Sequence, residues 1–198
     1  MKLFAIGAFA LASLTSGAAA AQTPAASTPV THGAPIAGVC IYSAQRVLGQ
    51  STAGQSLQTG LQRLAQEVQG ELAPYATSIQ TEAQQLQQGG QAADPDGSRR
   101  RAFQQRLDEA QQLEQTRQNE LRYTELMQTQ AIGQATSPII TALYQQRGCS
   151  LLLDRGSVFL ANPAMDITDA VIQQLNTTLP SLSFSRMAVP AQAQQPQQ

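Results

Sequence analysis

Charged and aromatic residues are scarce in this chain of 198 residues. Only 13% of the residues are charged and 5% are aromatic, there is no Trp, and the formal net charge is -1. A nucleic-acid surface needs Lys and Arg clustered on one face, so this charge balance argues against a nucleic-acid partner. The apolar fraction of 42% depends largely on Ala, which buries little surface, and the chain contains 32 Gln. We therefore do not expect a large rounded core.

The residues that usually build catalytic and metal sites are also rare. His32 is the only His, and it lies in a stretch rich in Pro, Ala, Ser and Thr that is typical of a linker. The folded region thus has no His to partner a nucleophile, and the sequence has no Gly-rich phosphate loop and no ligand cluster at metal-binding spacing. Asp108 and Glu109 are interpreted as solvated residues on a charged helix face. The sequence predicts a protein that is not an enzyme and that uses no cofactor or metal.

The longest apolar stretch stands at the N-terminus. Lys2 gives a positive start, residues 3–14 form an apolar run, and residues 18–21 are all Ala, as a signal peptidase site requires. A transmembrane anchor would need about 20 apolar residues, and this run is interrupted by Gly, Ser and Thr. We predict a cleaved signal peptide over residues 1–21, a linker over 22–35, and a mature chain outside the cytoplasm. Because Lys2 is the only Lys, cleavage leaves 11 Arg against 13 acidic residues, a net charge of -2.

Only two cysteines are present, Cys40 and Cys149. Neither has a companion at metal-ligand spacing. In an oxidising compartment an even number of cysteines favours a disulfide. Two separately buried thiols are the alternative.

The centre of the chain has the periodicity of a helix. Nine apolar residues from Leu57 to Leu86 recur at steps of three or four, with a mean step of about 3.6 residues. Pro74 lies inside this pattern, which resumes in phase at Ile79, so we expect a kink there rather than a helix end. Residues 89–98 concentrate Gly, Asp and Pro, and predict a turn at the tip of a helical arm.

A second helical arm follows this turn. Its composition is helical from Arg99 to Arg147, and Gly148 stands where a C-terminal cap is expected. At the helical rise per residue the two arms would be about 55 and 70 Å long, and they must lie antiparallel as a hairpin. Arg, Gln and Glu interrupt the apolar pattern of the second arm after Leu113, so we expect loose packing and mobility there.

Short apolar runs flank the arms. Residues 36–42 predict one strand, and residues 150–154 and 157–161 predict a β-hairpin. A last helix is expected to begin with Thr168 as N-cap and to end at Asn176. Strands with open edges and one modest face should be stable only when they pair with other copies.

These elements define the predicted organisation. We expect an α+β fold in which a long antiparallel helical hairpin is inserted between strands one and two of a small antiparallel β body. The body comprises residues 36–50 and 148–176, the hairpin residues 51–147, and a disordered tail rich in Pro and Gln residues 177–198.

Two segments resemble the Skp/OmpH family of periplasmic chaperones of Gram-negative bacteria. Residues 36–39 followed by Ala-Gln-Arg-Val-Leu at 44–48 resemble the family's opening strand and its Gln-Arg-Val turn into the first helix. Residues 148–158 (GCSLLLDRGSV) and 161–169 (ANPAMDITD) resemble its strand, turn, strand and aspartate-initiated last helix, in matching order and spacing. The resemblance covers about residues 36–176, although the arms resemble those of any coiled coil.

The resemblance implies a homotrimer shaped like a jellyfish, in which the sheets form a shared body and the hairpins surround a cavity for unfolded outer-membrane proteins. Two departures stand out. Well-known members are strongly basic and rich in Lys, whereas this mature chain has no Lys, and the family usually has an aromatic residue where Cys149 stands. The residues expected in the trimer body are Ile36, Val39, Ile41, Leu151, Leu153, Val158 and Leu160.

The resembling fold also brings the segments of Cys40 and Cys149 together in the body. The two thiols could then form a bridge within one chain that closes a loop of about 110 residues. A link between protomers is the competing arrangement, since three identical chains would share the body.

The residues themselves agree with a holdase chaperone. Unfolded barrel strands alternate apolar and polar residues and aggregate through their unpaired edges. Many weak contacts from Ala, Leu, Met and the stems of Gln and Arg on mobile arms would enclose such a chain without folding it. No sequence-specific pocket is needed for this task.

One basic cluster opens the second arm, formed by Arg99, Arg100, Arg101 and Arg106. Cations beside a helix N-terminus are electrostatically unfavourable, and a favourable partner could compensate for them. The cluster is either a solvated tip or a contact for client, anionic lipid or lipopolysaccharide.

Two other functions remain open. A structural coiled-coil envelope protein would need a continuous apolar pattern, and the interruption after Leu113 argues against it. A lipid or lipopolysaccharide carrier would need a deep apolar pocket, for which the short strands offer little material.

Overall fold

The computed structural model describes residues 30–90 and 94–191. The predicted signal peptide and most of the predicted linker lie outside these ranges. All elements belong to the compact unit Gly33–Gln198. Within the described ranges, no helix has both the length and the apolar content of a membrane span. In chain order the elements are β1 (Val39–Tyr42), α1 (Ala44–Gln50), α2 (Thr52–Gly89), α3 (Ser98–Gln146), β2 (Leu151–Asp154), η2 (Arg155–Ser157), η3 (Pro163–Met165) and α4 (Thr168–Thr178).

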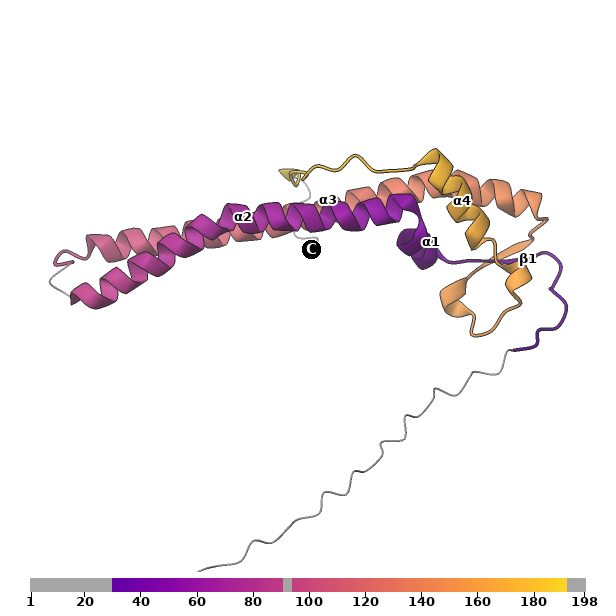
Figure 1. Cartoon of the computed structure of the whole chain (residues 1–198), viewed down its shortest axis with the longest axis horizontal. Coiled ribbons are helices and arrows are strands. Elements are labelled where there is room, and N and C mark those ends of the chain that lie inside the picture. Colours follow the sequence, from indigo (N-terminus) through magenta and orange to yellow (C-terminus); the bar gives the residue numbers. More distant parts are fainter. Residues whose placement is uncertain (1–29, 91–93, 192–198) are drawn as a thin grey trace, which may run out of the picture. The chain divides into compact units, whose positions relative to one another are not determined.

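The two long helices form the predicted antiparallel hairpin (Figure 1). Near the tip, Arg106 Nη1 of α3 lies 2.6 Å from Glu82 Oε2 of α2, and farther back Arg117 Nε lies 2.7 Å from Glu71 Oε2. Higher residue numbers in α3 thus face lower ones in α2. With 38 and 49 residues, the helices are about 57 and 74 Å long.

The helix boundaries follow the local sequence. The hydroxyl of Ser51 accepts a hydrogen bond from the Gly54 N–H and caps α2. The helix continues through Pro74, as predicted. At the end of α3, Gly148 has a positive φ of 63°, and the Cys149 N–H donates to the carbonyl of Tyr144 over 2.9 Å, which fits the predicted glycine cap.

The sheet differs from the prediction, because β1 and β2 are parallel and not antiparallel. Their register pairs Val39 with Leu151 and Tyr42 with Asp154. The physical reason is the unequal length of the arms. α3 has 49 residues against 38 in α2, and the eleven extra residues carry the chain about 16 Å farther back, past α1 and β1. β2 therefore starts beside the start of β1, where the Leu151 N–H donates to the Gly38 carbonyl.

The predicted third strand, residues 157–161, is also wrong. After β2 the carboxylate of Asp154 accepts the N–H of Gly156 over 2.7 Å, and this turn continues as the short 3-10 helix η2. In the part of the chain that the structure describes, the sheet has two strands. The other edge of β1 is used by Asp166, which forms an isolated bridge with Ile41. The local Asx turn thus diverts the chain before it can form a hairpin.

The last helix begins where predicted but is capped differently. Thr168 is its first residue rather than its N-cap, and its backbone N–H donates to Asp166 Oδ1 over 2.8 Å. The Thr168 hydroxyl accepts the backbone N–H of Ser43 over 3.0 Å and so joins α4 to the start of α1. α4 ends at Thr178, two residues beyond the predicted end.

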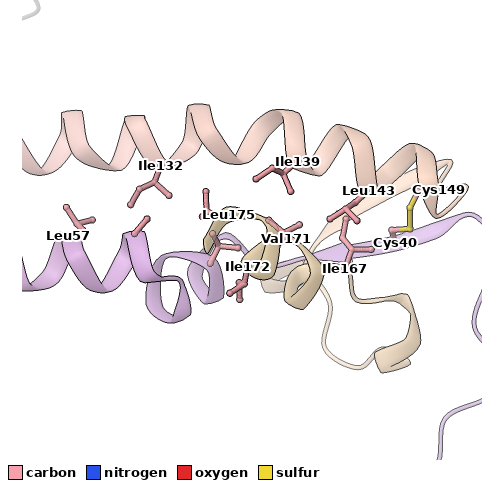
Figure 2. Close-up of a cluster of buried hydrophobic side chains, with 12 residues drawn as sticks. Cys40, Leu57, Ile132, Ile139, Leu143, Cys149, Ile167, Val171, Ile172 and Leu175 are labelled. Atoms are coloured by element: carbon pink, nitrogen blue, oxygen red, sulfur yellow. A yellow bond between two sulfur atoms is a disulfide. The ribbon is translucent and has the colours of Figure 1, made fainter. Parts of the chain in front are cut away.

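The core lies at the base of the hairpin, where α4 packs against α3 (Figure 2). The Cys40–Cys149 disulfide is present within the chain, with 5.8 Å between the two Cα atoms, and joins β1 to a residue two positions before β2. Burial in α2 does not extend beyond Val68, and in α3 it begins at Thr124. The core residues are Cys40, Val47, Ala53, Leu57, Ile132, Ile139, Leu143, Cys149, Ile167, Val171, Ile172 and Leu175.

Candidate functional site

The outer half of the hairpin presents partly exposed apolar side chains. Toward the tip, Leu72, Ile79 and Leu86 of α2 and Phe103 and Leu107 of α3 are all half-buried. Among the described residues, the partner helix alone covers the apolar face of each helix here, and part of that face remains accessible. This surface can offer many small apolar contacts along its length, which suits an extended apolar chain better than a compact ligand.

The tip of the hairpin neutralises part of its own basic cluster. The Asp94 side chain is fully buried, and its carboxylate accepts the backbone N–H groups of Arg99 and Arg100 over 2.9 and 3.2 Å. A carboxylate at the start of α3 is favourable there, and it offsets the cations at the same helix end. Part of the compensation for these cations thus comes from within the chain.

The four tip arginines differ in their surroundings. Arg99 donates to Gln85 across the hairpin, Arg100 lies 3.6 Å from Asp94, and Arg106 pairs with Glu82. Arg101 has no ion-pair partner among the residues that the structure describes. The structure therefore does not gather the four side chains into one open basic surface.

Asp96 shapes the same turn. Its carboxylate accepts the backbone N–H and the hydroxyl of Ser98, over 3.2 and 2.9 Å. These two hydrogen bonds, the backbone one first, hold the pKa of Asp96 below its ordinary value. The turn at the tip is thus stabilised when Asp96 is ionised.

The residues expected in a shared trimer body occupy different environments. Ile36, Leu151 and Leu160 are 64%, 50% and 60% exposed, and the neighbouring Phe159 is 95% exposed. Val39, Leu153 and Val158 are half-buried. Ile41 is only 1% exposed because the chain itself covers it. The apolar surface available to a partner near the sheet therefore excludes Ile41 and includes Phe159, which the sequence analysis did not name.

Arg46 joins the two segments that carry the family resemblance. Its guanidinium lies 3.4 Å from Asp166 Oδ2 and also pairs with Asp169. This contact ties α1 to the start of α4, although 120 residues separate Arg46 from Asp166. These ion pairs thus join the Gln-Arg-Val segment to the Asp-containing segment.

The C-terminal segment 179–190, expected to be part of a disordered tail, lies along both arms. Its backbone forms hydrogen bonds to arm side chains at four points. On α2, Ser56 Oγ accepts the N–H of Leu182 over 3.2 Å, and Arg63 Nη2 donates to the carbonyl of Phe184 over 2.8 Å. On α3, Gln128 Nε2 donates to the carbonyl of Ser183 over 3.0 Å, and Thr124 Oγ1 accepts the N–H of Met187 over 2.9 Å.

The ring of Phe184 occupies a position that requires glycine in α2. A Cβ atom built on Gly60 would lie 2.3 Å from Phe184 Cγ, far inside van der Waals contact. Gly60 itself is buried. Leu182 and Phe184 also pack against the hydrophobic core. We define the tail groove as the surface of α2 and α3 that contacts this segment: Ser56, Gly60, Arg63, Glu71, Glu120, Thr124 and Gln128.

Four charged side chains close the groove toward the tip. Arg186 of the tail lies 2.8 Å from Glu71 and 3.1 Å from Glu120, and Arg117 lies 2.7 and 3.0 Å from the same two carboxylates. The hydrogen bond from Arg186, followed by that from Arg117, lowers the pKa of Glu71 below its ordinary value. The hydrogen bonds to Glu71 and then Glu120 raise the pKa of Arg117. The tail is thus held by charge as well as by its backbone.

The groove corresponds to the interruption in the apolar pattern of α3. Arg117, Glu120, Thr124 and Gln128 follow Leu113 at steps of four, three, four and four, so the helical period continues with polar residues. Thr124 is fully buried. Glu120, Thr124 and Gln128 contact the tail, and Arg117 pairs with Glu71 and Glu120, where loose packing was expected. Two signals were available: the unbroken period, and the alternation Ser-Leu-Ser-Phe-Ser at residues 181–185.

Comparisons with known proteins agree with this architecture. A family model described as outer membrane protein (OmpH-like) matches residues 38–175. The crystal structure of a candidate OmpH-like outer membrane chaperone from Caulobacter crescentus CB15 is 35% identical, with a TM-score of 0.74. That match covers 83% of this chain and 98% of the other. No curated protein matches the chain significantly. The chain therefore belongs to the OmpH-like family of outer membrane protein chaperones, which are periplasmic and non-catalytic.

Proposed function

We propose that this protein is a periplasmic holdase that binds unfolded outer-membrane proteins between its helical arms and prevents their aggregation. The observation that carries this proposal is the outer half of the hairpin, where apolar residues such as Ile79 and Leu107 are only half-covered. Such a surface can hold an extended chain through many weak contacts and release it again.

The proposed working form is a homotrimer whose arms surround a cavity. The exposed apolar residues near the sheet, namely Ile36, Leu151, Phe159 and Leu160, support this assembly because a folded chain seldom leaves such side chains in water without a partner. Among the described residues no strand pairs with the outer edge of β2, and pairing with other copies would cover that edge.

The proposed location follows from the N-terminal sequence together with the family. Residues 1–21 have the order of charges, apolar residues and small residues of a cleaved signal peptide. The disulfide at the base of the arms supports the same location, because the periplasm is oxidising.

Contact of the arm tip with anionic lipid or lipopolysaccharide is a secondary proposal. It depends chiefly on Arg101, which is exposed and has no carboxylate partner among the described residues. A single cation contributes about 1 kcal/mol near an anionic surface, so this contact would be transient.

The aggregation of a barrel protein tests the main proposal. The purified mature protein is mixed with an eight-stranded outer-membrane barrel that is diluted from urea into buffer, and light scattering is followed over time. We expect scattering to fall as the protein approaches molar excess. Unchanged scattering at molar excess would refute the holdase function.

A further inference from the structure

The tail groove has the properties of a binding site for extended peptide. Four backbone groups of the tail, two N–H groups and two carbonyls, bind arm side chains over 2.8 to 3.2 Å. Backbone contacts of this kind do not depend on the side chains of the bound segment. They can therefore accept any extended chain that places its N–H and carbonyl groups at these positions.

The tail also has the sequence pattern of a membrane barrel strand. From Ser181 to Arg186, exposed and half-buried residues alternate strictly, with Leu182 and Phe184 on the covered side and the serines on the exposed side. Barrel strands alternate apolar and polar residues with the same period of two. The segment that occupies the groove thus resembles the clients of the proposed function.

The groove contributes two features that select its occupant. The absence of a side chain at Gly60 leaves room for an aromatic ring. Two residues farther along the tail, Glu71 and Glu120 face the guanidinium of Arg186, while Arg117 supplies the only other cation of this cluster. Without Arg186 the cluster has two carboxylates and one guanidinium, so it favours a cation at this position.

The tail does not satisfy all of its hydrogen-bond donors in the groove. The Nη1 atom of Arg186 is buried and has no hydrogen-bond partner among the described residues. A buried donor left unsatisfied costs free energy, which lowers the affinity of the tail for the groove. Residues 179–190 also form no helix or strand that would have to unfold on release.

We infer that the tail groove is a client-binding site, distinct from the cavity between arms, and that the tail is its built-in competitor. The ligand is an extended segment of an unfolded barrel protein with an aromatic residue followed two positions later by Arg or Lys. This inference rests on the proposed function. An arriving client segment displaces the tail, and the tail covers the groove when no client is present.

Three variants of the full mature chain separate these roles. Phe184→Ser removes the ring that anchors the tail and leaves the arms unchanged, so the groove opens. Gly60→Ala places a methyl group where the ring lies, so the groove closes to aromatic residues. Gly70→Ala is the matched control, because it lies in the same helix and its added Cβ would have no neighbour within 4 Å. Both Gly→Ala changes favour the helix, so the hairpin should remain folded.

Tail release is measured first, without any client. Trypsin cleavage after Arg186 should be slow in the unmodified protein and in Gly70→Ala, since two carboxylates hold that side chain. Cleavage should be several-fold faster in Phe184→Ser and Gly60→Ala. Equal cleavage rates in all four proteins would show that the groove does not retain the tail, and would overturn the inference.

Binding is then measured with a fluorescein-labelled synthetic peptide of residues 179–190. If the tail fills the groove most of the time, Phe184→Ser should bind the peptide on the order of tenfold more tightly than the unmodified protein. Gly60→Ala should not show this tighter binding, because the added methyl group occupies the position of the peptide's Phe ring. An unfolded eight-stranded barrel diluted from urea should displace the peptide from Phe184→Ser.

The outcomes distinguish this inference from the proposed function. A barrel that is kept from aggregating but leaves the peptide bound would show that clients use another surface, and would overturn the inference alone. A barrel that aggregates as it does without the protein would overturn the proposed function, and this inference with it.

Discussion

Cys40 and Cys149 are separated by 109 residues in the chain and by 5.8 Å between their Cα atoms. The disulfide holds the base of the hairpin to the start of the sheet. In the chain-entropy model a loop of this length contributes at most about 5 kcal/mol, from which native strain and residual structure in the unfolded chain subtract. This one disulfide can thus contribute more to the free energy of unfolding than many weak contacts along the arms.

We predict that reduction lowers the urea midpoint of the unmodified protein and leaves that of a Cys40→Ser/Cys149→Ser double variant unchanged. Both proteins are unfolded in urea with and without dithiothreitol, at one protein concentration because an oligomer's stability depends on it. A covalent dimer on a non-reducing gel, or a midpoint that does not respond to dithiothreitol, would contradict an intramolecular bridge.

Glu71 gives the tail contact a dependence on pH. Its pKa is lowered in the folded protein, chiefly by the hydrogen bond from Arg186 and further by Arg117. The folded state therefore favours ionised Glu71. The stabilisation is fully present above the ordinary pKa of a glutamate, about 4.3, and is lost as the pH falls through the lowered value.

We predict that acid releases the tail from the groove, at a pH below the ordinary pKa of a glutamate. The measurement is the NMR signal of the Met187 amide, whose N–H donates to Thr124. This signal should move toward its position in the free peptide of residues 179–190. A Glu71→Gln variant is the control, since it should show the weaker contact already at neutral pH. A Met187 signal that stays unchanged until the unmodified protein itself unfolds in acid would contradict the role given to Glu71.

Among the elements, α2 differs in packing along its length. Leu64 is 1% exposed and lies where the arms meet the core, whereas Leu86 near the tip is only half-buried. Stability should therefore be concentrated at the base. The outer arm can then move without unfolding the rest, which a surface that encloses varied clients requires.

We predict that Leu64→Ala costs about 2–5 kcal/mol of the free energy of unfolding, because it leaves a cavity in a closed core. Leu86→Ala, the same change in the same helix, should cost about 1 kcal/mol or less. Urea unfolding followed by circular dichroism measures both. Equal costs would indicate that the hairpin is packed uniformly, against the picture of a firm base and a loose tip.

The elements also show what sequence could and could not predict. The helical period and the turn residues at 89–98 were enough for the hairpin, and the compartment and parity of the cysteines favoured the disulfide. The parallel sheet was missed although the predicted arms, about 55 and 70 Å long, already differed. The strand direction depends on where α3 ends relative to β1, and the periodicity of each arm does not show this. The predicted β-hairpin after β2 was wrong because the Asp154 carboxylate accepts a hydrogen bond from the Gly156 N–H and redirects the chain.

The tail groove was missed for a different reason. It is formed by a glycine, a buried threonine and paired charges, and each of these residues looks unremarkable by itself in a helix rich in Gln. Only the contact with Phe184 gives Gly60 a role. Sequence patterns describe one element at a time, whereas this groove is formed by residues of α2 and α3 together with the tail.

At the scale of the whole molecule, we expect three copies of the chain to assemble into a homotrimer. We predict that Leu160→Asp converts a homotrimer into monomers, because a shared body would bury an unpaired carboxylate at a cost of several kcal/mol. Leu160 is 60% exposed in one chain, so the change should leave the monomer folded. Leu126→Asp on α3 is the matched control, with the same 60% exposure, and should remain trimeric.

Light scattering coupled to size exclusion measures these masses, and far-ultraviolet circular dichroism checks that helix content is kept. A folded monomer of the unmodified protein at micromolar concentration would contradict the shared body near Leu151 and Leu160. Dispersal by Leu126→Asp instead would place the interface on the arms.

The central claim is that copies of this chain together enclose one unfolded barrel protein. Native mass spectrometry of the mature protein, mixed with an eight-stranded barrel diluted from urea, measures the complex directly. The account predicts a complex of three chains with one barrel polypeptide, in which the barrel remains sensitive to protease and has not folded. Chains that stay free of the barrel, or that bind it only after it has folded, would contradict the claim.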